Sequence, residues 1–534
     1  MVLRAFRAAA LAAALMPIVA SGQRPAALPL KLEPRPTVGA ITREDLMTRL
    51  YQIADDSMGG RPTGSEGHVK VTAYIAAEAK RLGLLPGGDD GSYFQSLPVV
   101  SRGFVAGGSI RVAGKRFALG SDFGGLVLPG RTPAASAGGS IVVGGVMGDT
   151  TTWISAEEAA GKIVLLKASP RVVTMYPRGF YPPVSSRFAG AAAVLMGGWD
   201  AMPSTLQAAT MRRAISRVDD QPTRAMPLAL IISDAMAKTL MAAEGQHIAM
   251  DVAYEQAAAP ARNVVAILPG SDPRLRGQYV ALGAHSDHDP LTAWPVDHDS
   301  LRAANAKRSG TSPTLLPRGT YPARQDSIKN GADDDGTGTV ALLEIAEAMA
   351  TAPVKPRRST LFVWHVAEEL GLWGAEHFTS HPTVPLDSVV AQLNMDMIGR
   401  GGVGDIENGG PQFLLLVGSR RLSKELGDVL ESVNAARDFS FKFDYSWDAD
   451  GHPQRIYCRS DHALYARQGI PVTFFFTGLH LDYHQVTDEP QYIDYDKLYH
   501  VAGLVLDAAR ELGNRDQRPR LDGPKPSPNA ACRQ

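Results

Sequence analysis

Five residues of the types that bind metal ions occur in order along the second half of this 534-residue chain: His285, Asp334, Glu369, Asp396 and His484. Two imidazole nitrogens and three carboxylates suit zinc. A carboxylate shared between two ions can bridge a metal pair about 3.5 to 4 Å apart. The set therefore predicts a two-zinc centre and, with it, a metallohydrolase.

The chain around these residues predicts the strands that would bring them together. Four of the five follow short apolar runs rich in β-branched or aromatic residues, at 279–283, 359–366, 389–393 and 471–476. Asp334 instead precedes an expected helix that contains Val340 and Ile345. Open α/β sheets bind ligands beyond the carboxyl ends of their strands. We therefore expect all five side chains to share one crevice.

The alternation of strands and helices predicts an α/β fold, with a mixed, mostly parallel sheet flanked by helices. We expect this catalytic domain to comprise residues 40–122 and 255–512. Short β-rich runs and glycine turns between them predict an inserted β-rich module over 123–252. Its expected strands are 141–143, 163–166, 191–196 and 228–232.

Composition narrows the class of protein. Hydrophobic residues make up 44% and charged residues 20%, as in ordinary globular proteins. The formal charge of -1, without any basic run, argues against a nucleic-acid partner.

The first residues of the chain resemble an export signal over 1–22. Arg4 and Arg7 precede an apolar run at 8–20, and we expect cleavage near Gln23. The run is too short to span a bilayer, so we expect a periplasmic or secreted protein without a stable membrane anchor.

The chain has two cysteines, Cys458 and Cys532. An oxidising compartment would permit a bond between them. Residues 515–534 are rich in Pro, Arg, Asn and Ser, which predicts a disordered tail around Cys532. We therefore expect two unpaired thiols, although the sequence leaves pairing open.

Each candidate residue also has an ordinary structural interpretation. The carboxylates at 333–335 could cap a helix, and Glu368 and Glu369 could be a solvated pair. A single histidine is more often structural than a ligand, and we interpret His365, within a strand, in that way. His68, His247 and His500 are interpreted as ordinary packing or surface residues. The combination of five candidates is what favours a metal centre.

Asp287 is a candidate partner of His285, two residues away. A carboxylate hydrogen-bonded to a ligating imidazole fixes its tautomer and raises its basicity. A turn-forming aspartate is nearly as good an interpretation. His288 lies in the same loop.

The motifs together resemble those of the secreted cocatalytic zinc aminopeptidases of the bacterial leucyl aminopeptidase type, a family that includes plasma glutamate carboxypeptidase. The resemblance covers most of residues 40–512 and is carried by Gly283-Ala-His-Ser-Asp-His288, Asn330-Gly-Ala-Asp-Asp-Asp335, Ala367-Glu-Glu-Leu-Gly371, Asn394-Met-Asp-Met-Ile-Gly399, Tyr483-His484, Gly60-Arg-Pro-Thr-Gly-Ser65, Ser460-Asp-His462 and Gly469-Ile-Pro471. The inserted module is similar to the protease-associated domain of many members.

The resemblance implies roles for the individual residues. Asp334 would bridge the metals, with the assignment open by one position among the three adjacent acids. His285 and Asp396 would complete one site, and Glu369 and His484 the other. Glu368 would be the general base. It also implies a cis peptide bond at Asp334-Asp335, and the long segment 289–329 suggests a lid.

The expected activity is hydrolysis of peptide bonds. Zinc lowers the pKa of bound water to about 7, so a hydroxide between the metals could attack while Glu368 accepts a proton. The resemblance favours an aminopeptidase with two Zn²⁺ ions acting on peptides. A carboxypeptidase or dipeptidase of the same family, a receptor-like binding protein and a glutaminyl cyclase are alternatives. Mn or Co would also suit the donors. The oligomeric state and side-chain preference stay open.

Overall fold

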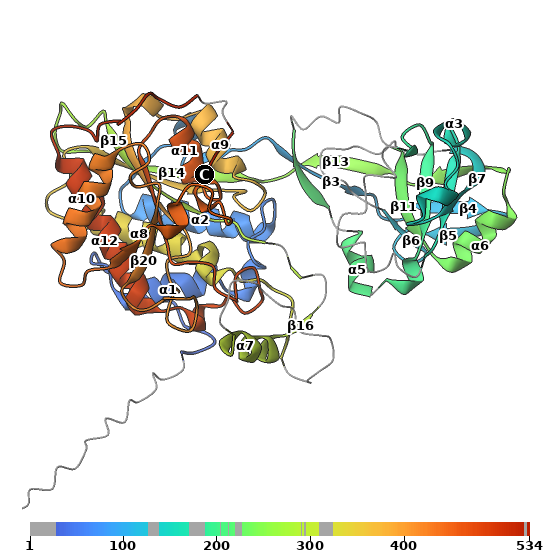
Figure 1. The fold of residues 1–534 in the computed structure, drawn as a ribbon, viewed down its shortest axis with the longest axis horizontal. Helices are drawn as coiled ribbons and strands as arrows, with labels where there is room; N and C mark the ends of the chain where they lie inside the picture. Colours follow the sequence, from blue (N-terminus) through green and yellow to red (C-terminus); the bar gives the residue numbers. More distant parts are fainter. Residues whose placement is uncertain are drawn as a thin grey trace, which may run out of the picture.

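A computed structural model describes residues 28–125, 138–169, 187–202, 204–211, 213–218, 227–289, 291–292, 295–308, 324–527 and 531–534. The predicted export signal at 1–22 and part of the suggested lid lie outside these ranges. Figure 1 shows two bodies, one built of helices around a sheet and one mainly of strands, joined by long strands. Within the described ranges, no helix is both long and apolar enough to cross a membrane.

The larger body is organised by a nine-stranded sheet of order β1-β14-β18-β15-β19-β22-β20-β21, with β2 also paired to β14. Its strands are β1 (Leu85–Pro86), β2 (Phe94–Ser96), β14 (Arg262–Leu268), β15 (Tyr279–His285), β18 (Ser359–His365), β19 (Val389–Met395), β20 (Phe413–Val417), β21 (Lys442–Asp444) and β22 (Val472–Phe476). The central strands β18, β15, β19 and β22 run parallel. Antiparallel pairings flank them through β14 and β20. The predicted mixed sheet is confirmed, with parallel pairing at its centre.

Helices cover both faces of this sheet. One face packs on α1 (Arg43–Ile53), α2 (Glu66–Arg81), α8 (Gly338–Thr351), α10 (Lys424–Ala435) and α12 (Tyr495–Asn514). The other packs on α9 (Trp373–Ser380) and α11 (His462–Arg467). The central strands are therefore buried on both sides, which explains why they read as apolar runs without alternation.

Local sequence signals fix the ends of the first helices. Thr42 and Ser65 accept hydrogen bonds from the free N–H groups at the starts of α1 and α2. On α1, the buried Arg49 pairs with Glu344 and Glu347 of α8. Burying one guanidinium with two carboxylates requires these helices to keep a fixed register, because an unpaired buried charge is costly.

The smaller body is the inserted module, built on an eight-stranded sheet of order β5-β4-β12-β7-β8-β9-β11-β6. Its strands are β4 (Ser109–Val112), β5 (Lys115–Ala118), β6 (Phe123–Gly125), β7 (Gly138–Val146), β8 (Ile163–Lys167), β9 (Ala193–Gly197), β11 (Leu228–Ile232) and β12 (His247–Asp251). Two apolar clusters, one on each face of this sheet, form its core. The boundary expected at residue 123 is wrong, because β4 and β5 already pair within the module.

A separate three-stranded sheet connects the two bodies. The strands β3 (Val99–Phe104) and β13 (Tyr254–Ala258) pair antiparallel, and β10 (Ala214–Arg217) pairs with the other edge of β3. The chain thus leaves the larger body and returns to it along neighbouring strands (Figure 1).

The end of the chain departs from two expectations. Cys458 and Cys532 form a disulfide bond, so the expectation of unpaired thiols is wrong. The described residues beyond 514 also contact the larger body: Arg518 donates to backbone carbonyls of Asp387 and Val389, and Gln534 contacts the backbone at Tyr457. The expected disordered tail is therefore wrong as well. Composition predicted disorder, but charged side chains and one covalent bond hold these residues in place.

Candidate metal centre

The carboxyl ends of four central strands bring the predicted ligands to one edge of the sheet. His285 is the last residue of β15, and Asp396 directly follows β19. Glu369 lies in the loop after β18, and His484 in the loop after β22. Asp334 lies just before α8. The structure thus brings all five predicted ligands together from five separate segments of the chain.

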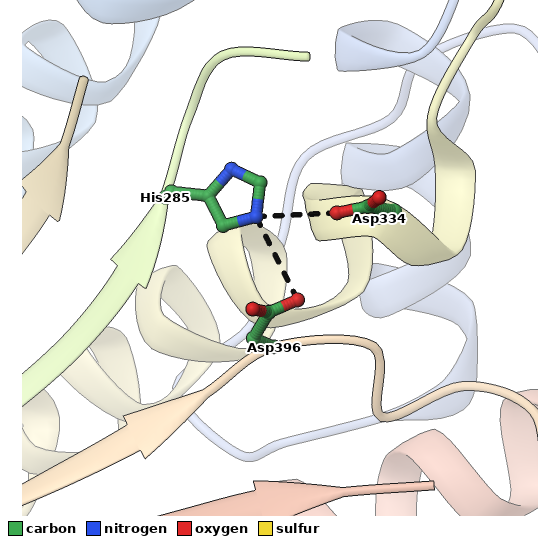
Figure 2. Close-up of side chains that lie close together, drawn as sticks. All are labelled: His285, Asp334 and Asp396. Atoms are coloured by element: carbon green, nitrogen blue, oxygen red, sulfur yellow. Dashed lines mark ion pairs between the residues drawn. The ribbon is translucent and has the colours of Figure 1, made fainter. Parts of the chain in front are cut away.

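His285 makes one end of the cluster. Its Nε2 lies 3.2 Å from Asp334 Oδ1 and 3.6 Å from Asp396 Oδ1. Figure 2 shows both carboxylates directed at this one nitrogen. Three donor atoms that converge in this way can hold a metal ion.

His484 makes the other end. Its Nε2 lies 3.0 Å from Asp334 Oδ2 and 3.2 Å from Glu369 Oε2. The two oxygens of Asp334 therefore face different histidines. This is the arrangement that a carboxylate bridging two metal ions requires.

The neighbours of Asp334 are engaged elsewhere. Asp333 Oδ1 accepts hydrogen bonds from Gly399 N and Thr337 Oγ1. Asp335 accepts from the backbone N–H groups of His285 and Met397, next to two of the predicted ligands. Among the three adjacent acids, only Asp334 faces the histidines, and the Asp334-Asp335 peptide bond is cis, as the resemblance implied.

The hydrogen bonding of the cluster tests whether a metal fits. Each predicted ligand has a buried side-chain atom without a hydrogen-bond partner among the described residues: His285 Nε2, Asp334 Oδ2, Glu369 Oε1, Asp396 Oδ1 and His484 Nε2. Buried polar atoms are rarely left unpaired, because each costs about 1 to 3 kcal/mol. These atoms converge on one another, and a pair of cations between them would satisfy all five.

The pKa values of two carboxyl groups in the site, those of Asp334 and Glu368, are shifted in opposite directions. Burial disfavours the charged form of Asp334, but the imidazoles of His285 and His484 outweigh it and hold its pKa well below the ordinary value. Burial raises the pKa of Glu368 well above the ordinary value, and neighbouring carboxylates add to the effect. Glu368 is thus suited to accept and release a proton, and Asp334 to stay charged.

Asp287 contacts His285 differently from the prediction. Its carboxylate Oδ1 is 3.8 Å from His285 Nδ1, too far for a hydrogen bond, whereas its backbone carbonyl oxygen is 3.1 Å away. The carboxylate instead accepts hydrogen bonds from Thr63 Oγ1 at 2.9 Å and from the Glu368 N–H at 3.2 Å. The predicted carboxylate–imidazole bond is therefore wrong. Asp287 orients His285 through its main chain and holds Glu368 through its side chain.

Two further residues of the first ligand loop belong to the site. Asp289 Oδ2 lies 3.2 Å from His484 Nδ1, and Lys329 Nζ lies 2.6 Å from the same oxygen. His288 Nδ1 lies 2.8 Å from Glu369 Oε1. Sequence reasoning assigned neither residue a role. The only signal in the sequence was that both residues are potential metal ligands and follow His285 within the same loop.

Residues from other parts of the chain hold the ligand loops. Asp488 accepts hydrogen bonds from the backbone N–H groups of Asp333 and Asp334. Ser460 Oγ donates to Asp396 Oδ2 at 2.8 Å. The Arg61 guanidinium, fully buried, donates to the carbonyl oxygens of Asn330 and Gly331. These contacts fix the loops that present Asp334 and Asp396.

The four histidines that the sequence analysis interpreted as structural or surface residues lie outside the cluster. His365 is buried, with Nδ1 3.2 Å from Asp461 Oδ2 and Nε2 3.0 Å from the Tyr465 hydroxyl. His68 is buried against Ser286, whereas His247 is exposed on the module and His500 stacks on Phe439. None of the four contributes to the groups of potential metal ligands found among the described residues.

A second group of potential ligands lies apart from this centre. His298 Nε2 is 3.4 Å from Glu489 Oε1, with Asp326 nearby. Here Arg324 Nη2 lies 2.7 Å from the same glutamate oxygen. A guanidinium already supplies the positive charge, so we assign no metal to this group.

An open cleft of about 470 Å³ leads to the candidate metal centre. Asp334, Glu368, Glu369, Asp396 and His484 form its polar floor. Its walls include the apolar side chains of Leu372, Met397, Ile456, Phe474, Phe476 and Leu479. A cleft that combines apolar side chains with a few converging polar groups is typical of a small-molecule or peptide binding site.

The fold and the converging ligands together define an α/β domain with a candidate two-metal centre at one edge of its sheet. Residues 263–509 match the model of peptidase family M28. The match contains all five predicted ligands and Glu368.

Several curated proteins are similar in sequence. The leupeptin-inactivating enzyme 1 of Streptomyces exfoliatus is 28% identical over 169 residues, which cover 31% of this chain and 33% of that protein. A probable leucine aminopeptidase of Trichophyton verrucosum is 26% identical over 260 residues, covering 47% of this chain and 57% of that protein. The matched region thus spans from a third to just over half of these relatives.

Solved structures with a similar chain path include a zinc aminopeptidase from Bacillus subtilis, at 16% identity and a TM-score of 0.49. That comparison covers 92% of this chain and 98% of the other. An aminopeptidase from Aneurinibacillus sp. strain AM-1 gives a TM-score of 0.46 at 17% identity, covering 91% and 97% of the two chains.

Proposed function

We propose that this protein is a zinc-dependent aminopeptidase that holds two Zn²⁺ ions and releases N-terminal amino acids from peptides. The observation that carries the proposal is the orientation of Asp334, whose two oxygens face His285 and His484 at 3.2 and 3.0 Å. His285 and Asp396 would hold one ion, Glu369 and His484 the other, and Asp334 both. The match to peptidase family M28 and the leucine aminopeptidases among the relatives support it.

Zinc, when bound, would lower the pKa of water and polarise the substrate carbonyl. Glu368 lies in the cleft beside the proposed ligands and belongs to none of the groups of potential metal ligands found among the described residues. Its place beside the ligands suits a general base that takes a proton from water and gives it to the leaving amine. Asp287 holds the backbone of Glu368 through a hydrogen bond, and the apolar walls would bind the substrate side chain.

The test is hydrolysis by the purified full-length protein. Leucine p-nitroanilide should be cleaved, N-acetyl-leucine p-nitroanilide should resist cleavage, and a chelator should abolish activity until Zn²⁺ is restored. Cleavage of N-blocked dipeptides in preference to free amines would instead indicate the carboxypeptidase alternative. A zinc-loaded protein that cleaves none of these substrates would contradict the proposal and favour a receptor-like role.

We propose further that the inserted module is a protease-associated domain. Its separate sheet, its own apolar clusters and its attachment through β3 and β13 support an insert that folds around its own core. Limited proteolysis should then release it as a stable fragment from cuts near the connecting strands. Its degradation alongside a surviving catalytic domain would argue against an independent core.

We also propose that the protein is exported. The predicted signal over 1–22 supports this, and the disulfide between Cys458 and Cys532 suits an oxidising compartment. Sequencing the N-terminus of protein from the native host should find Gln23 or a close neighbour first. An unprocessed Met1 would contradict export by this signal.

A further inference from the structure

Arg459 is the one arginine among the described residues that line the cleft, and no lysine lines it. It directly follows a 3-10 turn, Ile456–Cys458, in the cleft wall. The side chain is exposed, yet two hydrogen bonds direct it: Nη2 donates to the Tyr483 hydroxyl at 3.2 Å and Nη1 to Gln454 Oε1 at 3.3 Å. The guanidinium is therefore held at the cleft rather than free in solvent.

Neither acceptor of Arg459 carries a charge. Within the described part of the chain, its guanidinium forms no ion pair with a carboxylate. Arg421, in contrast, pairs with both Asp448 and Asp450. A guanidinium has five N–H donors and matches the geometry of a carboxylate. Arg459 thus keeps donors available for a negatively charged group in the cleft.

The position of Arg459 limits where such a group can lie. Tyr483, which accepts its hydrogen bond, lies against His484 with ring centroids 3.9 Å apart and ring planes tilted by 37°. One side chain therefore separates Arg459 from a proposed metal ligand. A peptide advances at most about 3.3 to 3.6 Å per residue. This position favours a carboxylate that belongs to a residue next to the scissile bond.

We propose that Arg459 binds a substrate carboxylate adjacent to the scissile bond, so that the enzyme favours peptides carrying one. This inference rests on the proposed peptidase function and names its substrate class. Two groups have the same chemistry: the free C-terminal carboxylate of a dipeptide, and an acidic side chain on the N-terminal residue. Both would form a charge-assisted pair with the guanidinium.

Two matched pairs of substrates separate these sources. Leucylglycine and leucylglycinamide differ only in the terminal carboxylate, whereas aspartyl-glycinamide and asparaginyl-glycinamide differ only in the side chain. The wild-type, zinc-loaded protein should prefer the charged member of at least one pair by about fivefold in kcat/KM, the scale of a partly exposed ion pair. Arg459→Gln should remove that preference, measured as the ratio of kcat/KM within each pair, and Arg459→Lys should retain part of it.

Arg455 provides the matched control, because it is an exposed arginine of the same loop that contacts the Cys532 carbonyl oxygen and does not line the cleft. Arg455→Gln should keep the wild-type preference. Absence of a carboxylate preference in the wild type, or its persistence in Arg459→Gln, would overturn the inference. If the uncharged substrates are not cleaved either, it is the proposed function that fails.

Discussion

The hydroxyl of Thr63 donates a hydrogen bond of 2.9 Å to Asp287 Oδ2. The other carboxylate oxygen of Asp287 accepts the backbone N–H of Glu368 at 3.2 Å, and its carbonyl oxygen contacts His285 Nδ1. The segment before α2 is thereby connected to the proposed base and to a proposed ligand. The Gly60-Arg-Pro-Thr-Gly-Ser65 motif, which carried part of the resemblance, has a physical role here.

Replacing Thr63 tests this connection. In Thr63→Ala the Asp287 carboxylate loses a buried hydrogen bond worth about 1 kcal/mol, and Glu368 loses part of its support. We expect kcat to fall by about three- to tenfold with little change in KM or zinc content. Thr63→Ser keeps the hydroxyl and should restore most of the activity. Equal losses in the alanine and serine variants would show that packing matters rather than the hydrogen bond.

The proposed base makes a sharper prediction. Glu368→Gln keeps the size of the side chain but cannot accept a proton, so kcat should fall by about 10² to 10⁴-fold. Both zinc ions should stay bound, because Glu368 belongs to none of the groups of potential metal ligands found among the described residues. Metal analysis and steady-state kinetics on one preparation check both points. A nearly active variant would remove Glu368 from the mechanism.

The proposed bridge predicts an unequal response of metal content to ligand loss. Asp334→Ala should lose both ions, since its two oxygens face both ends of the cluster. His484→Ala should lose one ion preferentially and keep the ion held by His285 and Asp396. Inductively coupled plasma mass spectrometry of dialysed protein measures the stoichiometry. Two ions in the Asp334→Ala variant would rule out a bridge at this position.

The sequence predicted the strands and the convergence of the five candidate ligands, because both follow from local signals. Buried parallel strands read as apolar runs, and a ligand after each run has a fixed place at the edge of the sheet. The contacts of Asp287 could not be predicted in the same way. Its carboxylate faces Thr63, 224 positions away in the chain, and only the folded structure shows which acceptor each donor reaches.

Two other features, the end of the chain and the boundary of the inserted module, could not be predicted from the sequence. Composition alone predicted a disordered tail, but it cannot register a pairing between residues 74 positions apart, as in Cys458–Cys532. Strands β4 and β5 are short and polar at their exposed positions, so their membership in the module follows only from their pairing with β12 and with each other. Long-range pairing decides both features.

The disulfide should contribute to stability and to the shape of the cleft. Cys458 lines the cleft, and Gln534, near its partner Cys532, accepts a hydrogen bond from Tyr457 N at 2.9 Å. In Cys458→Ser/Cys532→Ser we expect the free energy of unfolding to fall by about 2 to 4 kcal/mol and KM to rise. Thermal unfolding and kinetics measure the two effects, and wild-type protein treated with dithiothreitol should behave similarly. Unchanged melting temperature and KM would show that the tail is merely attached.

Buried His68 predicts a specific acid sensitivity. Its Nε2 lies 3.2 Å from Ser286 Oγ, which itself donates to the His365 carbonyl oxygen, so Nε2 carries the proton in this contact. Its Nδ1 is buried without a partner among the described residues. Burial, together with nearby Arg262 and Arg61, lowers the pKa of His68 from 6.5 to about 3.

Between these two pKa values the unfolded chain binds a proton at this position and the folded chain does not. The contribution of His68 to stability is therefore fully present above pH 6.5 and is lost as the pH falls from 6.5 towards 3. The loss should amount to a few kcal/mol, since each pKa unit corresponds to about 1.4 kcal/mol.

The variant His68→Gln has no titrating group at this position, so it should flatten the pH dependence of the free energy of unfolding, measured with urea on metal-free protein. His247→Gln, at an exposed position on the module, is the matched control and should keep the wild-type slope. Identical slopes for the wild type and His68→Gln would mean that His68 is not a source of the acid sensitivity, leaving it to other groups such as His462, whose pKa burial also lowers to about 3.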